Sequence, residues 1–145
     1  MNWSDTCKWK TFCEEHIFPV IAEKMGFRPE FKLEIVQKEI YEFVIGRKYP
    51  EEDPNHHYGI LARKAKTIFV REDNLPIIAF AFVHELMHIF YLPKDGESYL
   101  HYEMRIRFLA ISVFCGLMIY VLEEKAREYI DEIPFKTIIP DYLKK

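Results

Sequence analysis

Two histidines and a glutamate in the middle of the chain have the types and the spacing of a metal site. His84 and His88 stand four residues apart, and Glu85 directly follows the first of them. In a helix of about 3.6 residues per turn, positions i and i+4 lie one turn apart on one face, so both imidazoles can reach one ion. Glu85 then flanks the open position of that ion. The spacing predicts zinc bound by His84 and His88, with Glu85 as the catalytic residue.

The residues around this motif predict the helix that must carry it. Asp73 or Asn74 can cap its start, Pro76 falls in its first turn, and Leu92-Pro93 marks its end. The segment is apolar on several sides, and a buried pair of imidazoles needs a compensating partner, which a metal supplies. The alternative is an accidental pattern on a core helix.

A third protein ligand is expected in the next helix, over residues 98–130, because a catalytic zinc usually has three ligands and one open position. Glu97, His101 and Glu103 are the candidates. The residues that follow Glu103 at intervals of three and four positions are apolar, and they form one row along the helix. The Glu103 carboxylate should therefore point into the core, where it would require a cation or a metal as partner. The row from His101 is equally apolar, and periodicity alone does not separate the two. We expect Glu103 as the ligand, His101 as the alternative and Glu97 as a capping or surface residue. The competing role for Glu103 is a helix-surface salt bridge to Arg107.

These groups together predict hydrolysis of a peptide bond. Zinc lowers the pKa of a bound water, and Glu85 would take its proton as general base and deliver it to the leaving amine. Further donors are needed for the tetrahedral oxyanion. The candidates near the motif are Tyr91, Tyr99, Tyr102 and Arg105.

The length of 145 residues, the size of one ordinary domain, predicts a single domain over residues 1–145. Half of the 145 residues are hydrophobic and 16% are aromatic, which excludes disorder, and a net charge of −3 gives no electrostatic footprint for nucleic acid. The three cysteines are an odd number without metal-ligand spacing, and no secretory leader is visible. We therefore expect a cytoplasmic protein with reduced thiols.

One segment raises the question of a membrane. Residues 108–122 contain no charged side chain, but a spanning helix needs about 20 residues. The run is more typical of a helix buried on all sides in a globular core. A membrane-associated protease stays an alternative.

The other elements follow from periodicity and turn residues. A first helix is expected from Ser4 or Asp5, kinked or divided at Pro19. The polar loop 47–58 contains His56-His57, for which surface exposure is the default. Strands are expected at 31–36, 40–45, 59–62 and 67–70, with the last two forming a hairpin across a basic turn.

The order of these motifs resembles a known group of enzymes. A short strand at 67–70 (TIFV) precedes the zinc motif at 82–88 (FVHELMH), and Glu103 follows on the next helix. This arrangement is similar to a minimal zincin of the gluzincin sort, and most closely to the ImmA/IrrE-type metallopeptidase family. A second resemblance is to SprT-like proteases, whose third ligand is a histidine at about the distance of His101.

The resemblance implies an α+β fold. A small twisted sheet would pack on the N-terminal helix, the zinc-motif helix and a long C-terminal helix. It also implies Zn²⁺ as cofactor, regulatory cleavage of a specific cellular protein, and a substrate that adds as a strand to the sheet edge at 59–62 or 67–70. The alternative from another class is a non-catalytic zincin-fold protein that binds or regulates a partner.

Overall fold

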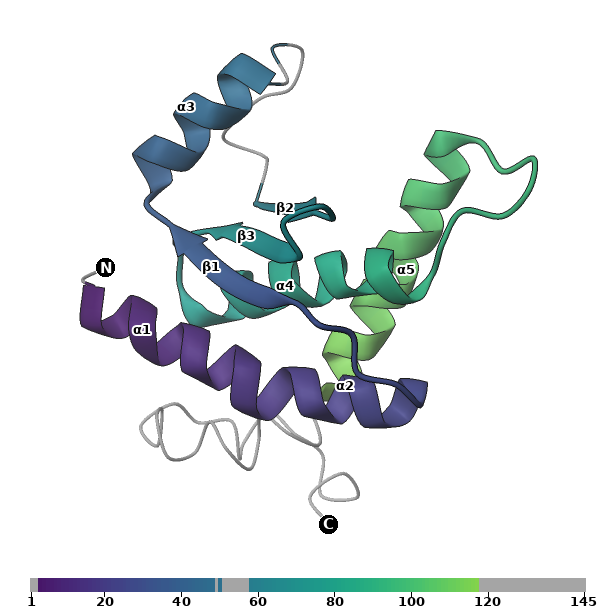
Figure 1. Cartoon of the computed structure of the whole chain (residues 1–145), viewed down its shortest axis with the longest axis horizontal. Helices are drawn as coiled ribbons and strands as arrows, with labels where there is room; N and C mark the ends of the chain where they lie inside the picture. Colours follow the sequence, from purple (N-terminus) through teal and green to yellow (C-terminus); the bar gives the residue numbers. More distant parts are fainter. Residues whose placement is uncertain (1–2, 49, 51–57, 118–145) are drawn as a thin grey trace.

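A small mixed sheet with helices against one of its faces gives an α+β fold (Figure 1). The computed structural model describes residues 3–48, 50 and 58–117. The elements, in chain order, are α1 (Trp3–Phe12), the π-helical turn η1 (Cys13–Ile17), α2 (Phe18–Met25), β1 (Lys32–Val36), α3 (Lys38–Lys48), β2 (Gly59–Ala62), β3 (Thr67–Arg71), α4 (Leu75–Phe90) and α5 (Tyr99–Leu117).

The sheet has β3 at its centre and β2 at an edge. Its order is β1-β3-β2, with β1 parallel and β2 antiparallel to β3. Because side chains alternate along a strand, the register places one apolar set on a single face. That set packs into the core against the helices and consists of Leu33, Ile35, Leu61, Ile68 and Val70. The expected strands at 31–36, 59–62 and 67–70 are confirmed, with shifts of at most one residue at their ends.

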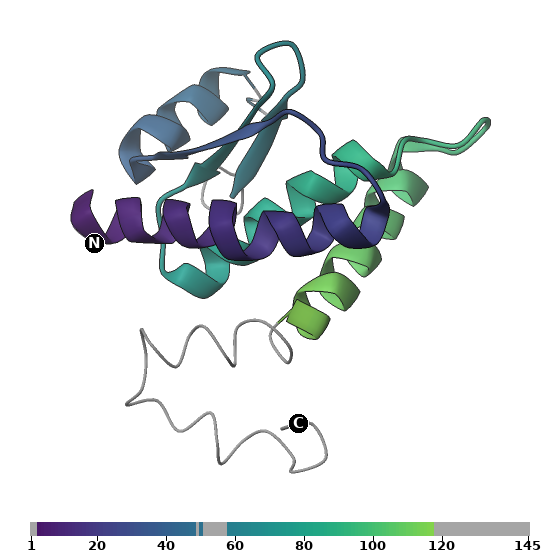
Figure 2. The ribbon, with the colours of Figure 1, turned by 60° about the horizontal axis from the view of Figure 1, so that its bottom comes forward.

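The N-terminal helical segments form one continuous rod that crosses beneath the sheet (Figures 1 and 2). The rod begins at Trp3, slightly before the expected start at Ser4 or Asp5. Pro19 lies in the first turn of α2, directly after the π-helical turn. Proline lacks an N–H, so this position tolerates it where a helix interior would not. The rod continues through Pro19, so the expected division of the helix is not present, and a π-helical turn lies before this position instead.

The prediction of a strand at 40–45 is wrong, because these residues belong to α3. The segment contains β-branched and aromatic residues, which favour strands. Its buried side chains, however, are Tyr41 and Ile45, four residues apart as on one helix face. The Glu72 carboxylate also accepts a hydrogen bond from the Lys38 N–H at 3.0 Å. That contact satisfies one of the free donors at the start of α3.

Helix α4 begins as its capping signals predict. The Asn74 side chain accepts a hydrogen bond from the Ile77 N–H at 3.2 Å, and Pro76 lies in the first turn. Ser98 caps α5 in the same way by accepting from the His101 N–H at 3.2 Å. The rest of the expected helix 98–130 and the pair His56-His57 lie outside the described residues.

The apolar run at 108–122 is described as far as residue 117, and there it is not buried on all sides. Phe108 is 68% exposed and Ile111 is 48% exposed, whereas Ala110 and Leu117 are buried. Helix α5 therefore has one core-facing side and one exposed apolar side, which contradicts the expectation of a fully buried helix. Within the described part of the chain, no helix combines the length and apolarity that crossing a bilayer would require.

Candidate metal centre

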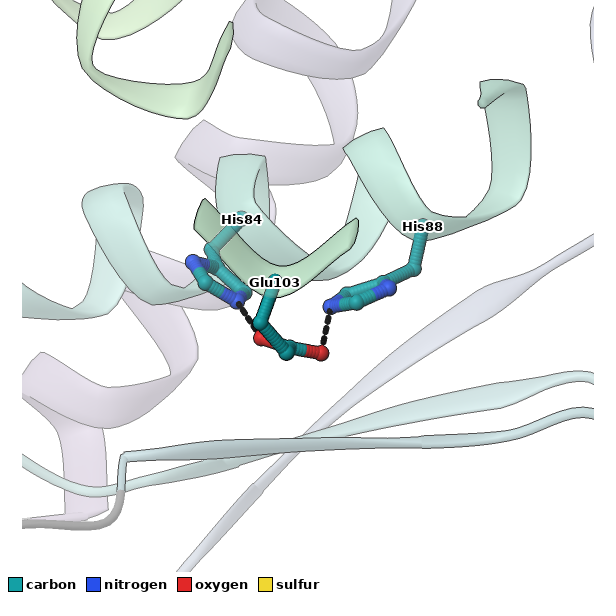
Figure 3. A group of neighbouring side chains, drawn as sticks. All are labelled: His84, His88 and Glu103. Carbon is teal, nitrogen blue, oxygen red and sulfur yellow. Dashed lines mark ion pairs between the residues drawn. The ribbon is translucent and has the colours of Figure 1, made fainter. Parts of the chain in front are cut away.

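Helices α4 and α5 together bring three potential metal ligands to one point (Figure 3). His84 and His88 lie on the same face of α4, with ring centroids 5.2 Å apart. Glu103 faces them from the first turns of α5. One of its carboxylate oxygens lies 3.2 Å from His88 Nε2, and the other lies 3.8 Å from His84 Nε2.

Packing between the two helices fixes this meeting point. Ile106 follows Glu103 on the core side of α5 and is fully buried, as is Ala110 one turn later. Phe114 then contacts Phe80 of α4 edge to face, at a centroid distance of 5.4 Å. The inward row expected from the periodicity of α5 is therefore present, and it holds Glu103 opposite the two histidines.

The three side chains fit a zinc ion in chemistry and in spacing. Two imidazole nitrogens and a carboxylate are a donor set typical of catalytic zinc. A tetrahedral ion with bonds of about 2.0 to 2.2 Å separates neighbouring ligand atoms by about 3.3 to 3.6 Å. The potential ligand atoms of His84, His88 and Glu103 all lie within 4.8 Å of one another, close enough for one ion to be shared among them.

His101, the alternative third ligand, does not reach this point. Its side chain is exposed on the other side of α5, on the same exposed row as Met104 and Phe108. Glu103 pairs with the two histidines and not with Arg107, so the surface salt bridge considered for it is not formed. The rotation of α5 about its own axis decides between Glu103 and His101.

Glu85 lies next to the ligand cluster and under the edge strand. The residue is only 8% exposed, in contrast to the partly open ligands. A β-carbon added at Gly59 of β2 would stand 3.2 Å from Cγ and 3.3 Å from Oε1 of Glu85. The strand therefore passes the carboxylate so closely that glycine at position 59 makes room for it.

The two carboxylates of the site have pKa values displaced in opposite directions. Burial raises the pKa of Glu85 from its ordinary 4.5 to about 7; His84 and Arg63 oppose this rise, and Glu103 adds to it. Hydrogen bonds from His84 and then His88 lower the pKa of Glu103 to about 2. Glu103 is thus held as an anion suited to bind a cation, while Glu85 is suited to exchange a proton near neutrality.

A cleft of about 990 Å³ opens above these residues. Its walls come from β2 and α5, and α4 forms its floor. Outside the ligand cluster and Glu85, it is lined by Tyr58, Gly59, Ile60, Leu61, Arg63, Pro76, Ile77, Phe80, Ala81, Tyr99, Arg107 and Ile111.

Arg63 is a residue of the site that sequence reasoning missed. It belongs to the turn between β2 and β3, and its Nη2 donates a hydrogen bond to the His88 carbonyl at 2.9 Å. The hairpin is thereby attached to the ligand-bearing turn of α4. The sequence signal was the basic turn at 63–66, but its spacing gave no indication of this long-range contact.

The four residues considered as oxyanion donors have different surroundings. Tyr99 lines the cleft. Tyr91 points its hydroxyl at Met25 Sδ, at 3.8 Å. Arg105 binds Glu97, with contacts of 2.8 and 2.9 Å, and the Leu92 carbonyl. The Tyr102 hydroxyl lies beside His88 Nδ1 at 3.1 Å, on the side of the ring away from the ligand cluster.

Glu97 is neither a helix cap nor a surface residue as expected, because Ser98 caps α5 and the Glu97 side chain is only 12% exposed in the loop before it. Its carboxylate accepts the Lys94 N–H at 2.9 Å and also receives Arg105. The hydrogen bond from Arg105 is the main cause that lowers the pKa of Glu97 to about 2.

Comparisons of this chain with protein-family models, with curated proteins and with solved structures gave no match.

Proposed function

We propose that this protein is a zinc-dependent endopeptidase. The observation that carries the proposal is the convergence of His84 Nε2, His88 Nε2 and the Glu103 carboxylate next to a buried Glu85. A purely structural zinc site is usually closed by a fourth protein ligand and has no need of a neighbouring base. Among the described residues, only these three form such a cluster, which leaves a fourth position for water.

The chain's own residues divide the chemistry between them. A zinc ion in this site would act as a Lewis acid and lower the pKa of a bound water. Glu85 would accept a proton from the attacking water at its carboxylate and donate it to the leaving amine nitrogen. His84, His88 and Glu103 would hold the ion. The pKa of about 7 that burial gives Glu85 suits a group that must both take and give a proton.

The edge strand β2 offers a place for the substrate backbone. The Arg71 N–H donates to the Tyr58 carbonyl at 2.9 Å, so this pair is hydrogen-bonded across β2 and β3. Antiparallel ladders alternate, and the N–H and C=O groups of Gly59 and Leu61 therefore point to the free edge. Both residues line the cleft. A peptide added as a strand there would pass beside Glu85 and the metal ligands.

This arrangement supports the resemblance to minimal gluzincins of the ImmA/IrrE type. A helix carrying two histidines, a glutamate from the next helix and an adjacent edge strand are the parts that the resemblance implies. The runner-up resemblance to SprT-like proteases needs a histidine as third ligand, and His101 is exposed away from the cluster. We therefore propose the first group.

Metal analysis of purified variants tests the ligand set. The parent should bind one equivalent of zinc, and Glu103→Ala should lose most of it. His101→Ala is the matched control on the same helix and should bind as the parent does. Zinc retained in Glu103→Ala but lost in His101→Ala would overturn the assignment.

Cleavage of an unfolded protein substrate tests the reaction. Glu85→Gln should abolish cleavage while zinc remains bound, because the base is removed and the ligands are kept. Equal cleavage by parent and Glu85→Gln would refute the general-base role. A parent that binds zinc but cleaves no substrate would favour the non-catalytic alternative.

A further inference from the structure

The ring of His88 has a second partner besides the ligand cluster. Tyr102 precedes Glu103 on α5 and is only 7% exposed. Its hydroxyl oxygen lies 3.1 Å from His88 Nδ1, and its O–H donates a hydrogen bond to the Tyr91 carbonyl at 2.7 Å. The two rings meet edge to face, at a centroid distance of 5.3 Å. Two successive contacts thus connect three groups: the His88 ring, the Tyr102 hydroxyl and the Tyr91 carbonyl.

The protons in this chain of contacts can be assigned. A tyrosine hydroxyl has one proton, and a carbonyl oxygen can only accept. The hydroxyl proton therefore lies between Tyr102 and the Tyr91 carbonyl, which leaves the Tyr102 oxygen as acceptor for His88 Nδ1–H. When His88 binds a metal through Nε2, the lone pair of that nitrogen forms the bond and the one N–H of the ring is on Nδ1, where the Tyr102 oxygen can accept it. Nε2 faces Glu103 and the position of the metal.

The Tyr102 ring is itself held in place from outside. The Arg105 guanidinium lies 5.4 Å from the ring centroid. Arg105 in turn donates to Glu97 at 2.8 and 2.9 Å and to the Leu92 carbonyl at 3.0 Å. These contacts of Arg105 connect the loop between α4 and α5 to the Tyr102 side chain. They orient the Tyr102 hydroxyl in the metal-free protein.

We propose that Tyr102 is a positioning residue for the metal site: its hydroxyl accepts the Nδ1 proton of His88 and so directs the Nε2 lone pair at the metal. The inference rests on the proposed zinc site but not on peptide cleavage. Helix α5 then has two functions in one turn, because Glu103 supplies a ligand and its neighbour Tyr102 orients another. Such outer partners commonly change metal affinity by about 10- to 100-fold.

The test compares Tyr102→Phe with Tyr91→Phe. Tyr102→Phe keeps the ring and removes the hydroxyl. Tyr91→Phe removes a nearby hydroxyl that points at Met25 and leaves the Tyr91 backbone carbonyl in place. In competition with a chelator, Tyr102→Phe should bind zinc about 10- to 100-fold more weakly than the parent, and Tyr91→Phe should bind as the parent does.

A nuclear magnetic resonance measurement separates positioning from packing. In the zinc-loaded parent, the His88 Nδ1–H proton should exchange slowly with water and show a nuclear Overhauser effect to the Tyr102 ring. Tyr102→Phe should lose the slow exchange, while the histidine signals of His84 stay unchanged and report an intact fold. Absence of the Overhauser effect in the parent would refute the inference without any variant.

The remaining outcomes are equally decisive. Parent-like affinity in Tyr102→Phe refutes the inference and leaves the proposed function intact. Weaker affinity with an unchanged His88 Nδ1–H signal also refutes it, because the hydroxyl would then act through packing alone. A parent that binds zinc without cleaving substrate refutes the proposed enzyme and leaves the positioning role standing. A parent that binds no zinc refutes both.

Discussion

Replacing Glu85 by glutamine is expected to stabilise the metal-free protein at neutral pH and above. Burial raises the pKa of this carboxyl from 4.5 to about 7, so the folded state holds the proton more tightly than the unfolded chain does. Proton binding therefore contributes fully to stability below about pH 4.5, and this contribution is lost as the pH rises through 7. Glutamine has nearly the same shape and no charge to desolvate.

The expected size of the effect follows from the same interval. Each pH unit between the unfolded and the folded pKa corresponds to about 1.4 kcal/mol in the free energy of unfolding. As the pH rises from 4.5 to about 7, the free energy of unfolding of the parent should fall by about 3 kcal/mol, and that of Glu85→Gln should not show this fall. Titrating groups away from Glu85 are common to both proteins and cancel in the difference.

The measurement is urea denaturation of both proteins at pH 5 and pH 8 with a chelator present. The advantage of Glu85→Gln over the parent should grow by about 2 to 3 kcal/mol between the two pH values. Glu30→Gln is the control, because the Glu30 side chain is 89% exposed and pairs with the surface residue Lys66. Its effect should stay within about 0.5 kcal/mol at both pH values. If the difference in the free energy of unfolding between Glu85→Gln and the parent does not change with pH, the pKa of Glu85 is not raised by burial.

Three further outcomes are expected. Free zinc at 100 times its dissociation constant should raise the free energy of unfolding of the chelator-stripped parent by about 2.7 kcal/mol, as measured by calorimetry. Glu103→Ala should show little of this increase, and an equal increase in both proteins would exclude Glu103 as a ligand. Ile106→Ala should cost about 2 to 5 kcal/mol in urea denaturation, since the side chain is fully buried between α5 and α4; a cost under 1 kcal/mol would contradict that packing. Gly59→Ala should lower kcat for peptide cleavage at least several-fold with zinc content unchanged, because its methyl group would press on Glu85. A β-carbon added at Gly46 has no atom within 4 Å, so Gly46→Ala should cleave like the parent. An unchanged kcat in Gly59→Ala would show that the short distance between Gly59 and Glu85 does not affect cleavage.

Local structure was predictable wherever one helix turn or one cap decides it. The spacing of His84 and His88 places both imidazoles on one face of any helix, and the Asn74 cap with Pro76 marks where that helix begins. The alternation in β1 and the hairpin of β2 and β3 were visible for the same reason, since the side chains of a strand repeat every two residues.

Segments with conflicting local signals were not predictable in this way. Residues 40–45 have the composition of a strand, yet they fold as α3, with Tyr41 and Ile45 buried one turn apart. Strand propensity depends on the surface that a segment packs against, and that surface is made by other parts of the chain. The run 108–117 likewise has one apolar side in the core and another exposed, which composition alone does not distinguish.

The sequence by itself determined the two histidines, the glutamate beside them and the zinc chemistry that they predict, because the helical repeat converts spacing directly into geometry. Only the tertiary structure decided which residue of the next helix faces them. Glu103 and His101 begin equally apolar rows, and the packing of Ile106 and Ala110 against α4 turns Glu103 inward. The closeness of Gly59 to Glu85 and of Tyr102 to His88 also depends on contacts between distant segments, which no local pattern encodes.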